Sequence, residues 1–273
     1  MISWIIDRCY IKQPRLRRAV TKLVFGDRDV QIELFGVPFQ INTLRENGYL
    51  RAARKTRNSS LLQGEIAPMI TIANLLRPGD TFVDVGANIG LYSCTLARRT
   101  AHNKANPLRF YAYEPHPDTF KRLVHNAKEC GVIARNLAIS DNKATLEFVD
   151  GAVSHVFTRI EQRNAYNINS SRIVVPAVRL DEELIEGESI VLKIDVEGQE
   201  LSAVKGASKL FAACKIKAVY FDGYKDKSLV EGFLRDYGFS IIDLKTMGSI
   251  TEHTFGLLAI HPSRFTKPES HEA

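Results

Sequence analysis

The chain has 273 residues, of which 45% are hydrophobic, and a formal net charge of +6. This size and composition suit one large α/β domain with or without an appendage, and they exclude a largely disordered chain. The four cysteines are scattered without the spacing of a metal site or a disulfide framework, which favours a reducing compartment and predicts no bound metal.

The positive charge is concentrated in residues 1–60, which hold 12 Lys and Arg against 5 Asp and Glu. A segment of this kind is most often a solvated face. The alternative is contact with an anionic partner, which could be a membrane surface, a nucleotide-linked sugar or a polyanionic glycan. Trp4, Ile5 and Ile6 lie beside several basic residues, a pattern that suits a helix at a membrane surface. The apolar run at the start is too short and too charged for a signal peptide or a membrane span, and we therefore expect a cytoplasmic protein, with membrane association as the alternative.

The basic segment 1–60 is predicted to precede a second unit at 61–262, with a flexible tail at 263–273. Within 26–50, two β-rich runs separated by Gly36-Val37-Pro38 predict a hairpin, and the charged stretch 51–60 predicts a connector. From 61 onward, continuous apolar strands alternate with amphipathic helices, which is typical of a parallel sheet covered on both faces. The predicted strands are 81–85, 109–114, 133–139, 144–149, 172–178, 189–195, 215–223, 239–244 and 254–260, and the predicted helices are 61–76, 90–100, 117–127, 200–210 and 227–237.

The first strand of this series ends in VDVGANIG, where an acidic residue meets a glycine-rich turn and then a helix. Ligands of doubly wound sheets bind beyond the carboxyl ends of the strands, and Gly86 and Gly90 allow the backbone to approach a ligand closely. Asn88 replaces the middle glycine of the dinucleotide fingerprint, and Asp84 is unfavourable beside a pyrophosphate. A carboxylate suits the ammonium and sulfonium of S-adenosylmethionine, although capping of its own turn is the structural alternative.

Two acidic residues further along the chain extend the predicted cofactor site. Glu114 follows the second strand, where a carboxylate accepts hydrogen bonds from both hydroxyls of a ribose. Asp141 follows the next strand and is placed to accept a hydrogen bond from an adenine amino group. The stretch Ser140-Asp141-Asn142 is also compatible with an ordinary turn.

The stretch VLKIDVEGQE places Lys193 and Asp195 on one face of a buried strand, where both are costly to bury unless they are paired or functional. Asp195 and Glu197 are expected at the substrate edge of the cofactor site, and Asp222, at the end of the following strand, is expected to face the same edge. A Lys193–Asp195 pair that caps the next helix is the structural alternative.

Together, FVDVGANIGLYS, YAYEPHPDTFKRLVHN, LAISD and SIVLKIDVEGQELSAVKGA resemble the FkbM-type S-adenosylmethionine-dependent methyltransferases over about residues 62–260. The resemblance implies a class I methyltransferase fold, which is a Rossmann-like, doubly wound, mostly parallel seven-stranded sheet with an antiparallel last strand. It also implies O-methylation of a hydroxyl of a sugar, a glycan or another small alcohol. By the family pattern, Glu65 lies near the methionine end of the cofactor.

A hydroxyl acceptor benefits from a general base, for which Asp195 or Glu197 is the first candidate and Asp222 the next. His155 is a further candidate, although a lone histidine in an insertion is usually only exposed. Two other readings remain at this point: a nicotinamide-dependent oxidoreductase on a similar sheet, and a non-catalytic module that binds a membrane or nucleic acid through the basic segment. No RNA-binding signature or recognition helix is present in the sequence, so nucleic acid is not expected as a partner.

Overall fold

The computed structural model describes residues 14–55, 60–101, 107–150, 157–159, 172–244, 246–251 and 256–265. Its centre is a seven-stranded sheet with the order β12-β13-β11-β10-β3-β4-β5. The strands are β3 (Thr81–Val85), β4 (Arg109–Tyr113), β5 (Val132–Arg135), β10 (Ile190–Ile194), β11 (Ile216–Asp222), β12 (Ser240–Asp243) and β13 (Gly256–Ile260). Only β13 runs antiparallel to its neighbours β11 and β12 in this sheet. The predicted α/β fold with an antiparallel last strand is therefore confirmed.

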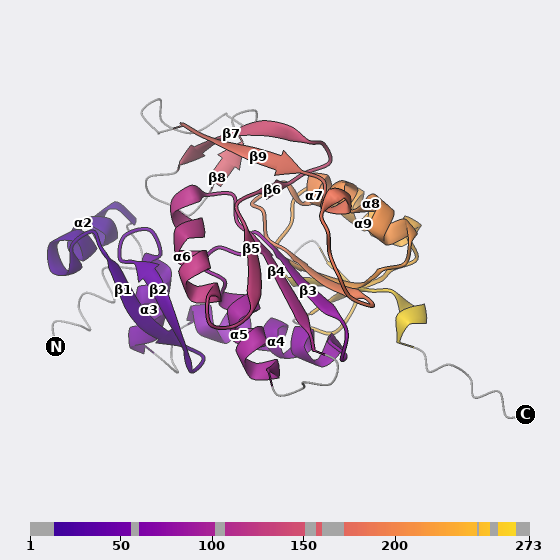
Figure 1. Ribbon diagram of the computed structural model, residues 1–273, viewed down its shortest axis with the longest axis horizontal. Coiled ribbons are helices and arrows are strands. Elements are labelled where there is room, and N and C mark those ends of the chain that lie inside the picture. Colours follow the sequence, from indigo (N-terminus) through magenta and orange to yellow (C-terminus); the bar gives the residue numbers. More distant parts are fainter. Residues whose placement is uncertain are drawn as a thin grey trace, which may run out of the picture.

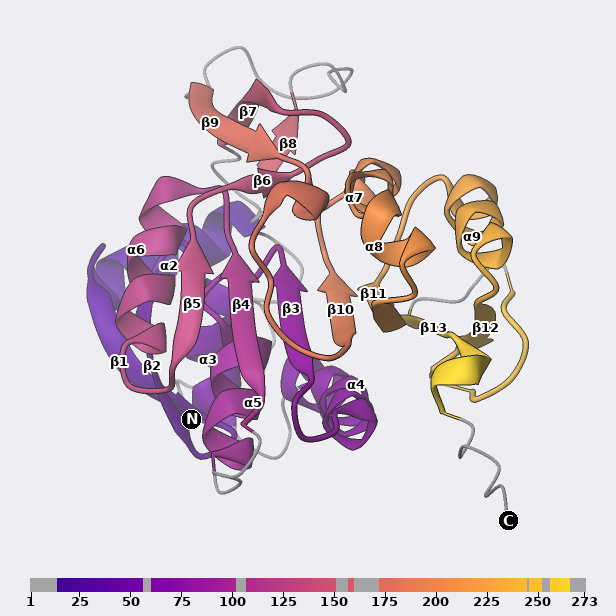
Figure 2. The same ribbon diagram turned by 45° about the vertical axis from the view of Figure 1, so that its right-hand side comes forward.

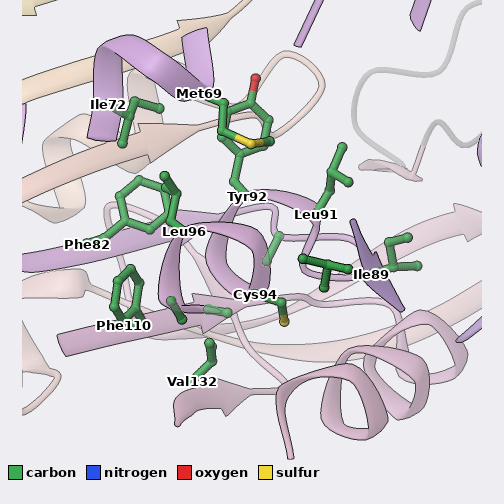
Figure 3. Close-up of a cluster of buried hydrophobic side chains, with 14 of the residues drawn as sticks. Met69, Ile72, Phe82, Ile89, Leu91, Tyr92, Cys94, Leu96, Phe110 and Val132 are labelled. Carbon is green, nitrogen blue, oxygen red and sulfur yellow. The ribbon is translucent and has the colours of Figure 1, made fainter. Parts of the chain in front are cut away.

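Helices cover both faces of this sheet (Figures 1 and 2). The central strands β3 and β10 are buried at every position, because alternate side chains enter cores on opposite faces. Phe82 packs on one face with Leu96 and Phe110, as Figure 3 shows, whereas Val83 and Val85 pack on the other. The covering helices are α4 (Ser60–Leu75), α5 (Leu91–Thr100) and α6 (Pro117–Ala127) on the first face, and α7 (Glu200–Gly206), α8 (Ser208–Ala212) and α9 (Lys227–Asp236) on the second.

The basic N-terminal segment folds into α2 (Pro14–Phe25), the hairpin of β1 (Asp29–Leu34) and β2 (Val37–Asn42), and α3 (Asn47–Lys55). The predicted hairpin is confirmed. Its turn residues Phe35 and Gly36 both have positive φ, which matches the right-handed twist of the strands they join. The predicted connector 51–60 is wrong in its first half, because residues 51–55 continue α3. Trp4, Ile5 and Ile6 lie outside the described residues.

The hairpin shares a core with the sheet. Phe39 and Ile41 belong to the same buried cluster as Phe82. The side chain of Asn126 on α6 acts as a substitute strand partner, since it accepts from the Gln40 N–H at 2.7 Å and donates to the Gln40 carbonyl at 3.1 Å. Residues 14–55 are therefore attached to the rest of the protein by apolar packing and by backbone pairing.

A second buried connection joins the same two parts. Arg122 on α6 donates to Glu46, just before α3, over 2.6 Å, and both side chains are almost fully buried. Burial raises the pKa of Glu46, and Arg122 opposes that effect. Removing either partner would leave an unpaired buried charge, which is strongly destabilising.

A small second sheet stands apart from the main one, with the order β6-β9-β7-β8. The strands predicted at 144–149 and 172–178 exist, as β7 (Ala144–Asp150) and β9 (Arg172–Val178), and they pair here with β6 (Ala138–Ile139) and β8 (Phe157–Arg159). Figure 2 shows this sheet beyond the arrowheads of β4 and β5, at the end of the main sheet where ligands of such folds bind.

The remaining elements are short turns and the C-terminal end of the chain. The described ranges also contain the 3₁₀ turns η3 (Leu180–Glu182) and η4 (Pro262–Arg264). The predicted tail starts inside η4, and its residues 266–273 lie outside the described part, as does His155. No helix in the described ranges has both the length and the apolar character needed to cross a bilayer.

Candidate functional site

The turn after β3 is fixed to the neighbouring strand by its backbone. The N–H groups of Gly86 and Ala87 both donate to the carbonyl of Tyr113, each at 3.0 Å. Gly86 has φ +78°, and a Cβ at this position would lie 1.9 Å from the carbonyl oxygen of Asp195. The glycine is therefore required by the contact between the turn after β3 and the end of β10, whatever ligand is present.

The helix α5 begins at the second glycine of the motif. Gly90 has φ +84°, and a Cβ there would lie 2.7 Å from Leu123 and 2.8 Å from the sulfur of Cys94. Asn88 also has a positive φ, 52°, a conformation that asparagine tolerates better than most residues. Its side-chain oxygen is buried and accepts no hydrogen bond from the described residues. A buried acceptor of this kind is ready for a donor on a ligand.

Glu114 lies directly beside this turn. One carboxylate oxygen accepts from the Asn88 N–H at 2.9 Å and the other from the His116 N–H at 2.8 Å. Burial raises the pKa of Glu114 to about 7, although the two N–H donors oppose the shift. The side chain of Asn136, which the sequence analysis did not identify, donates to the carbonyl of Glu114 at 2.8 Å and holds its backbone from the β5 side.

A buried lysine forms the centre of the site. The side chain of Lys193 is 4% exposed, and its Nζ lies 3.3 Å from Asp84 and 3.6 Å from Asp195. Burial alone would lower the pKa of Lys193, but the surrounding carboxylates outweigh it and raise the pKa. Asp84 and Lys193 are direct partners in the register of β3 and β10. The Lys193–Asp195 pair that was the structural alternative is present, but Lys193 lies closer to Asp84, and within the described residues the helix α7 has no side-chain cap.

Two tyrosines connect the lysine to two further predicted acids. The Tyr92 hydroxyl donates to Glu65 on α4, and the Tyr92 ring lies under the Lys193 ammonium at 5.0 Å. The Tyr220 hydroxyl donates to Asp222 at 3.2 Å, and the two tyrosine rings are 6.2 Å apart. Burial raises the pKa of Glu65, and the hydrogen bond from Tyr92 limits that rise. The structure thus brings Glu65, a residue distant in sequence, to the same cluster as Asp84 and Asp195.

The loop after β10 carries the predicted catalytic carboxylates. Burial is the largest cause of a raised pKa at both Asp195 and Glu197, with Lys193 opposing it at Asp195. Glu197 has a positive φ, 51°, and is more exposed than Asp195, so the protein removes it from water only in part. Glu200, which the sequence analysis did not single out, accepts from the Gly198 N–H at 2.7 Å and from the Lys225 N–H at 3.1 Å, and so holds this loop beside the one after β11.

The N-terminal segment also reaches the cluster, through Tyr49 on α3. Burial raises the pKa of Tyr49 well above its usual range, and the negative charges of Glu65, Asp195 and Asp84 raise it further. The Tyr49 side chain also packs against the buried cluster that contains Tyr92, so Tyr49 is a neighbour of the site. No pattern in the sequence pointed to it, because its spacing is that of an ordinary amphipathic helix.

Asp141 has its own local contacts in the loop after β6. Its carboxylate accepts from the Ser140 hydroxyl at 3.2 Å, and Arg179 donates to its backbone carbonyl. These contacts agree with the turn that was the alternative to an adenine contact. The role of Asp141 toward adenine stays a prediction.

The carboxylates and the free amide oxygen of this site fit the predicted cofactor. S-adenosylmethionine carries an ammonium and a sulfonium, and the site offers the carboxylates of Glu65, Asp84 and Asp195 together with the unsatisfied oxygen of Asn88. Glu114 lies at the tip of the second strand, the expected place for ribose. No group of three or more His, Cys, Asp or Glu side chains within the described ranges is arranged to hold a metal ion.

Comparison with known proteins identifies the family. The model described as "Methyltransferase FkbM domain" matches residues 84–241, which is more than half of the chain and contains the turn, Lys193 and the loop after β10. The chain belongs to the FkbM family of S-adenosylmethionine-dependent methyltransferases. The predicted family, enzyme class and cofactor are thereby confirmed.

A curated relative of this FkbM protein is the hexuronic acid methyltransferase AglP of Haloferax volcanii, 27% identical over 151 residues. The match covers 53% of this chain and 57% of AglP, so the chain spans a little over half the length of that relative.

Solved structures that resemble the chain include two methyltransferases. One is a TehB-like S-adenosylmethionine-dependent enzyme from Corynebacterium glutamicum (12% identity, TM-score 0.41, 79% of this chain and 96% of that one). The other is a precorrin-6y C5,15-methyltransferase from Geobacter metallireducens (12% identity, TM-score 0.40, 76% and 91%). The family assignment does not depend on them, because it comes from the sequence match over residues 84–241.

Proposed function

We propose that this protein transfers a methyl group from S-adenosylmethionine to a hydroxyl oxygen of a sugar or glycan. The observation that carries the proposal is the group of carboxylates at the carboxyl ends of β3, β10 and β11, arranged around the buried Lys193. The cofactor supplies the methyl group when bound. The chain supplies a site that favours a cation and a set of bases at the edge where an acceptor would lie.

The charge of the site favours a neutral acceptor group. Glu65, Asp84, Asp195 and Asp222 all act on Lys193, and Glu197 acts together with Glu200 near Lys225. Carboxylates outnumber lysines in this set, so an anionic acceptor group would meet net repulsion. AglP is described as acting on a hexuronic acid, which offers both hydroxyl and carboxylate oxygens. The excess of acids supports a hydroxyl as the acceptor.

Asp195 is the best candidate for the base. It lies at the tip of a central strand, and its raised pKa makes it a better proton acceptor than an ordinary aspartate. Lys193 at 3.6 Å opposes that rise in the pKa and orients the carboxylate. Asp195 would remove the proton of the acceptor hydroxyl as the new bond forms, and Glu197 and Asp222 are the next candidates.

Incubation with labelled S-adenosylmethionine and a panel of neutral sugars, uronic acids and glycan extracts tests the proposal. A label that survives mild alkali marks a methyl ether on a hydroxyl, whereas one released by alkali marks an ester on a carboxylate. Asp195→Asn serves as the matched inactive protein. Label found only as an ester, or transferred equally by the variant, would contradict a hydroxyl acceptor with Asp195 as base.

Thermal stabilisation by ligands separates this proposal from the two earlier alternatives. Adenosylhomocysteine should raise the melting temperature and NAD should not, because a ligand stabilises a protein only when it binds the folded state preferentially. A cytoplasmic location is part of the proposal, and it suits the free thiols of Cys94, Cys130 and Cys214.

A further inference from the structure

The helix α2 is held to the protein by one face. Thr21 is fully buried and its hydroxyl accepts from the Asn47 side chain on α3 at 2.7 Å. Four residues on, Phe25 packs against the hydrophobic core and lies under the guanidinium of Arg54 at 5.0 Å. Figure 1 shows α2 at the edge of the molecule, beside β1 and α3. This attachment gives the helix a fixed orientation.

The opposite face of α2 exposes apolar side chains. Leu16 is 46% exposed, Leu23 is 87% exposed and Val24 is 57% exposed. Positions i, i+7 and i+8 share one face of a helix, so the three side chains form a single apolar strip. One exposed leucine needs no explanation, but an apolar strip on a fixed helix is typical of an interaction surface.

The charge of the same helix indicates what that surface binds. Its twelve residues, PRLRRAVTKLVF, contain four basic residues and no acidic one. A helix that combines an exposed apolar strip with basic residues is typical of proteins that lie in the interface of an anionic bilayer. Each Lys or Arg near such a surface contributes about 1 kcal/mol of attraction, or about fivefold in affinity.

We propose that α2 docks this protein on an anionic lipid bilayer, with Leu16, Leu23 and Val24 inserted among the headgroups and the side chains of Arg17 and Lys22, which flank this strip, facing lipid phosphates. The carboxylate cluster takes no part in this contact, so the proposal stands independently of methyl transfer. If the protein also has the proposed function, docking in this way would bring it to lipid-linked glycans on the same bilayer.

Co-sedimentation of the full-length protein with vesicles tests the proposal. The wild type should bind phosphatidylglycerol–phosphatidylcholine vesicles, bind pure phosphatidylcholine vesicles much more weakly, and lose affinity as salt is raised. Leu23→Ser/Val24→Ser should weaken binding by about 30-fold, because it removes most of the apolar strip. Lys22→Gln should weaken it by about fivefold.

The chain offers a matched control for the apolar variant. Leu184 and Leu229 are 84% and 58% exposed, close to the values for Leu23 and Val24, and lie outside α2. Leu184→Ser/Leu229→Ser should bind vesicles as the wild type does. Equal binding to neutral and anionic vesicles, no binding to either, or equal loss in both double variants would overturn the proposal. So would binding to nucleic acid that competes fully with the vesicles.

Discussion

Replacing Glu114 by glutamine should remove the pH dependence of cofactor binding near neutrality. The wild-type carboxylate has a pKa of about 7 in the free protein, because it is buried beside only two N–H donors. A ribose donates its hydroxyl protons, so it binds the ionised form better than the protonated form. Glutamine keeps the size of the side chain but never ionises.

The size of the effect follows from that pKa. Between pH 8 and pH 6 the ionised fraction of Glu114 falls from about nine-tenths to about one-tenth, so affinity for adenosylhomocysteine should fall about tenfold. Binding at pH 6 should release close to one proton. In the variant the affinity should be flat with pH and lower throughout, since each hydrogen bond lost to a charged group costs about 1.5–3 kcal/mol.

Glu114 also makes the free energy of unfolding depend on pH. The native pKa lies above the ordinary value of 4.5, so between pH 4.5 and about 7 the folded protein binds more protons than the unfolded chain. The free energy of unfolding contributed by Glu114 therefore falls as pH rises through that window, and Glu114→Gln should remove this fall.

Titration calorimetry at pH 6, 7 and 8, in buffers of different ionisation enthalpy, measures affinity and proton release together. Urea unfolding without ligand at the same pH values measures how the free energy of unfolding changes with pH. A variant with the same pH slope as the wild type, or with an affinity within twofold of it at pH 8, would refute the placement of Glu114 at the ribose.

Three further predictions concern the same site. Asp195→Asn should lower kcat about 100-fold, the usual range for loss of a general base, while affinity for adenosylhomocysteine changes little; turnover close to wild type would exclude Asp195 as the base. Tyr92→Phe removes the hydroxyl that donates to Glu65 and should weaken cofactor binding by roughly tenfold in calorimetry. The loss should be larger at pH 6 than at pH 8, because the pKa of Glu65 rises further without this hydrogen bond, and an unchanged pH profile would argue against this role of Tyr92. Gly86→Ala should lower the free energy of unfolding by about 3 kcal/mol in urea unfolding. Gly26 has a similar φ, but a Cβ there would meet no atom within 4 Å, so Gly26→Ala should lower the free energy of unfolding by less. Equal losses in the two variants would mean that backbone strain alone matters.

Most of the main sheet was predictable because its strands are largely apolar runs between turn residues. The small second sheet was not, although two of its strands were predicted. β9 pairs with β6, which has only two residues, and such non-local pairing has no signal in a local pattern. The whole of α3 also escaped prediction, because its charged sequence is held in place by core contacts such as those of Leu50 and Ala52.

The sequence predicted which residues would gather at the site where a motif and a strand end coincide, but it did not predict which of them would be neighbours across different strands. Asp84 and Lys193 are partners only because β3 lies beside β10, an order that the sequence does not state. The contact from Tyr92 to Glu65 joins two helices, and Tyr49 comes from the N-terminal segment, which was predicted as a separate unit. Each of these contacts depends on packing between elements that are distant along the chain.

A crystal structure of the protein with adenosylhomocysteine is the most direct test of the whole account. The ribose hydroxyls should lie within hydrogen-bonding distance of Glu114, the amino-acid end should lie among Glu65, Asp84 and Asn88, and the sulfur should face the Asp195 edge. A ligand bound elsewhere, or one whose sulfur points away from Asp195 and Asp222, would contradict it.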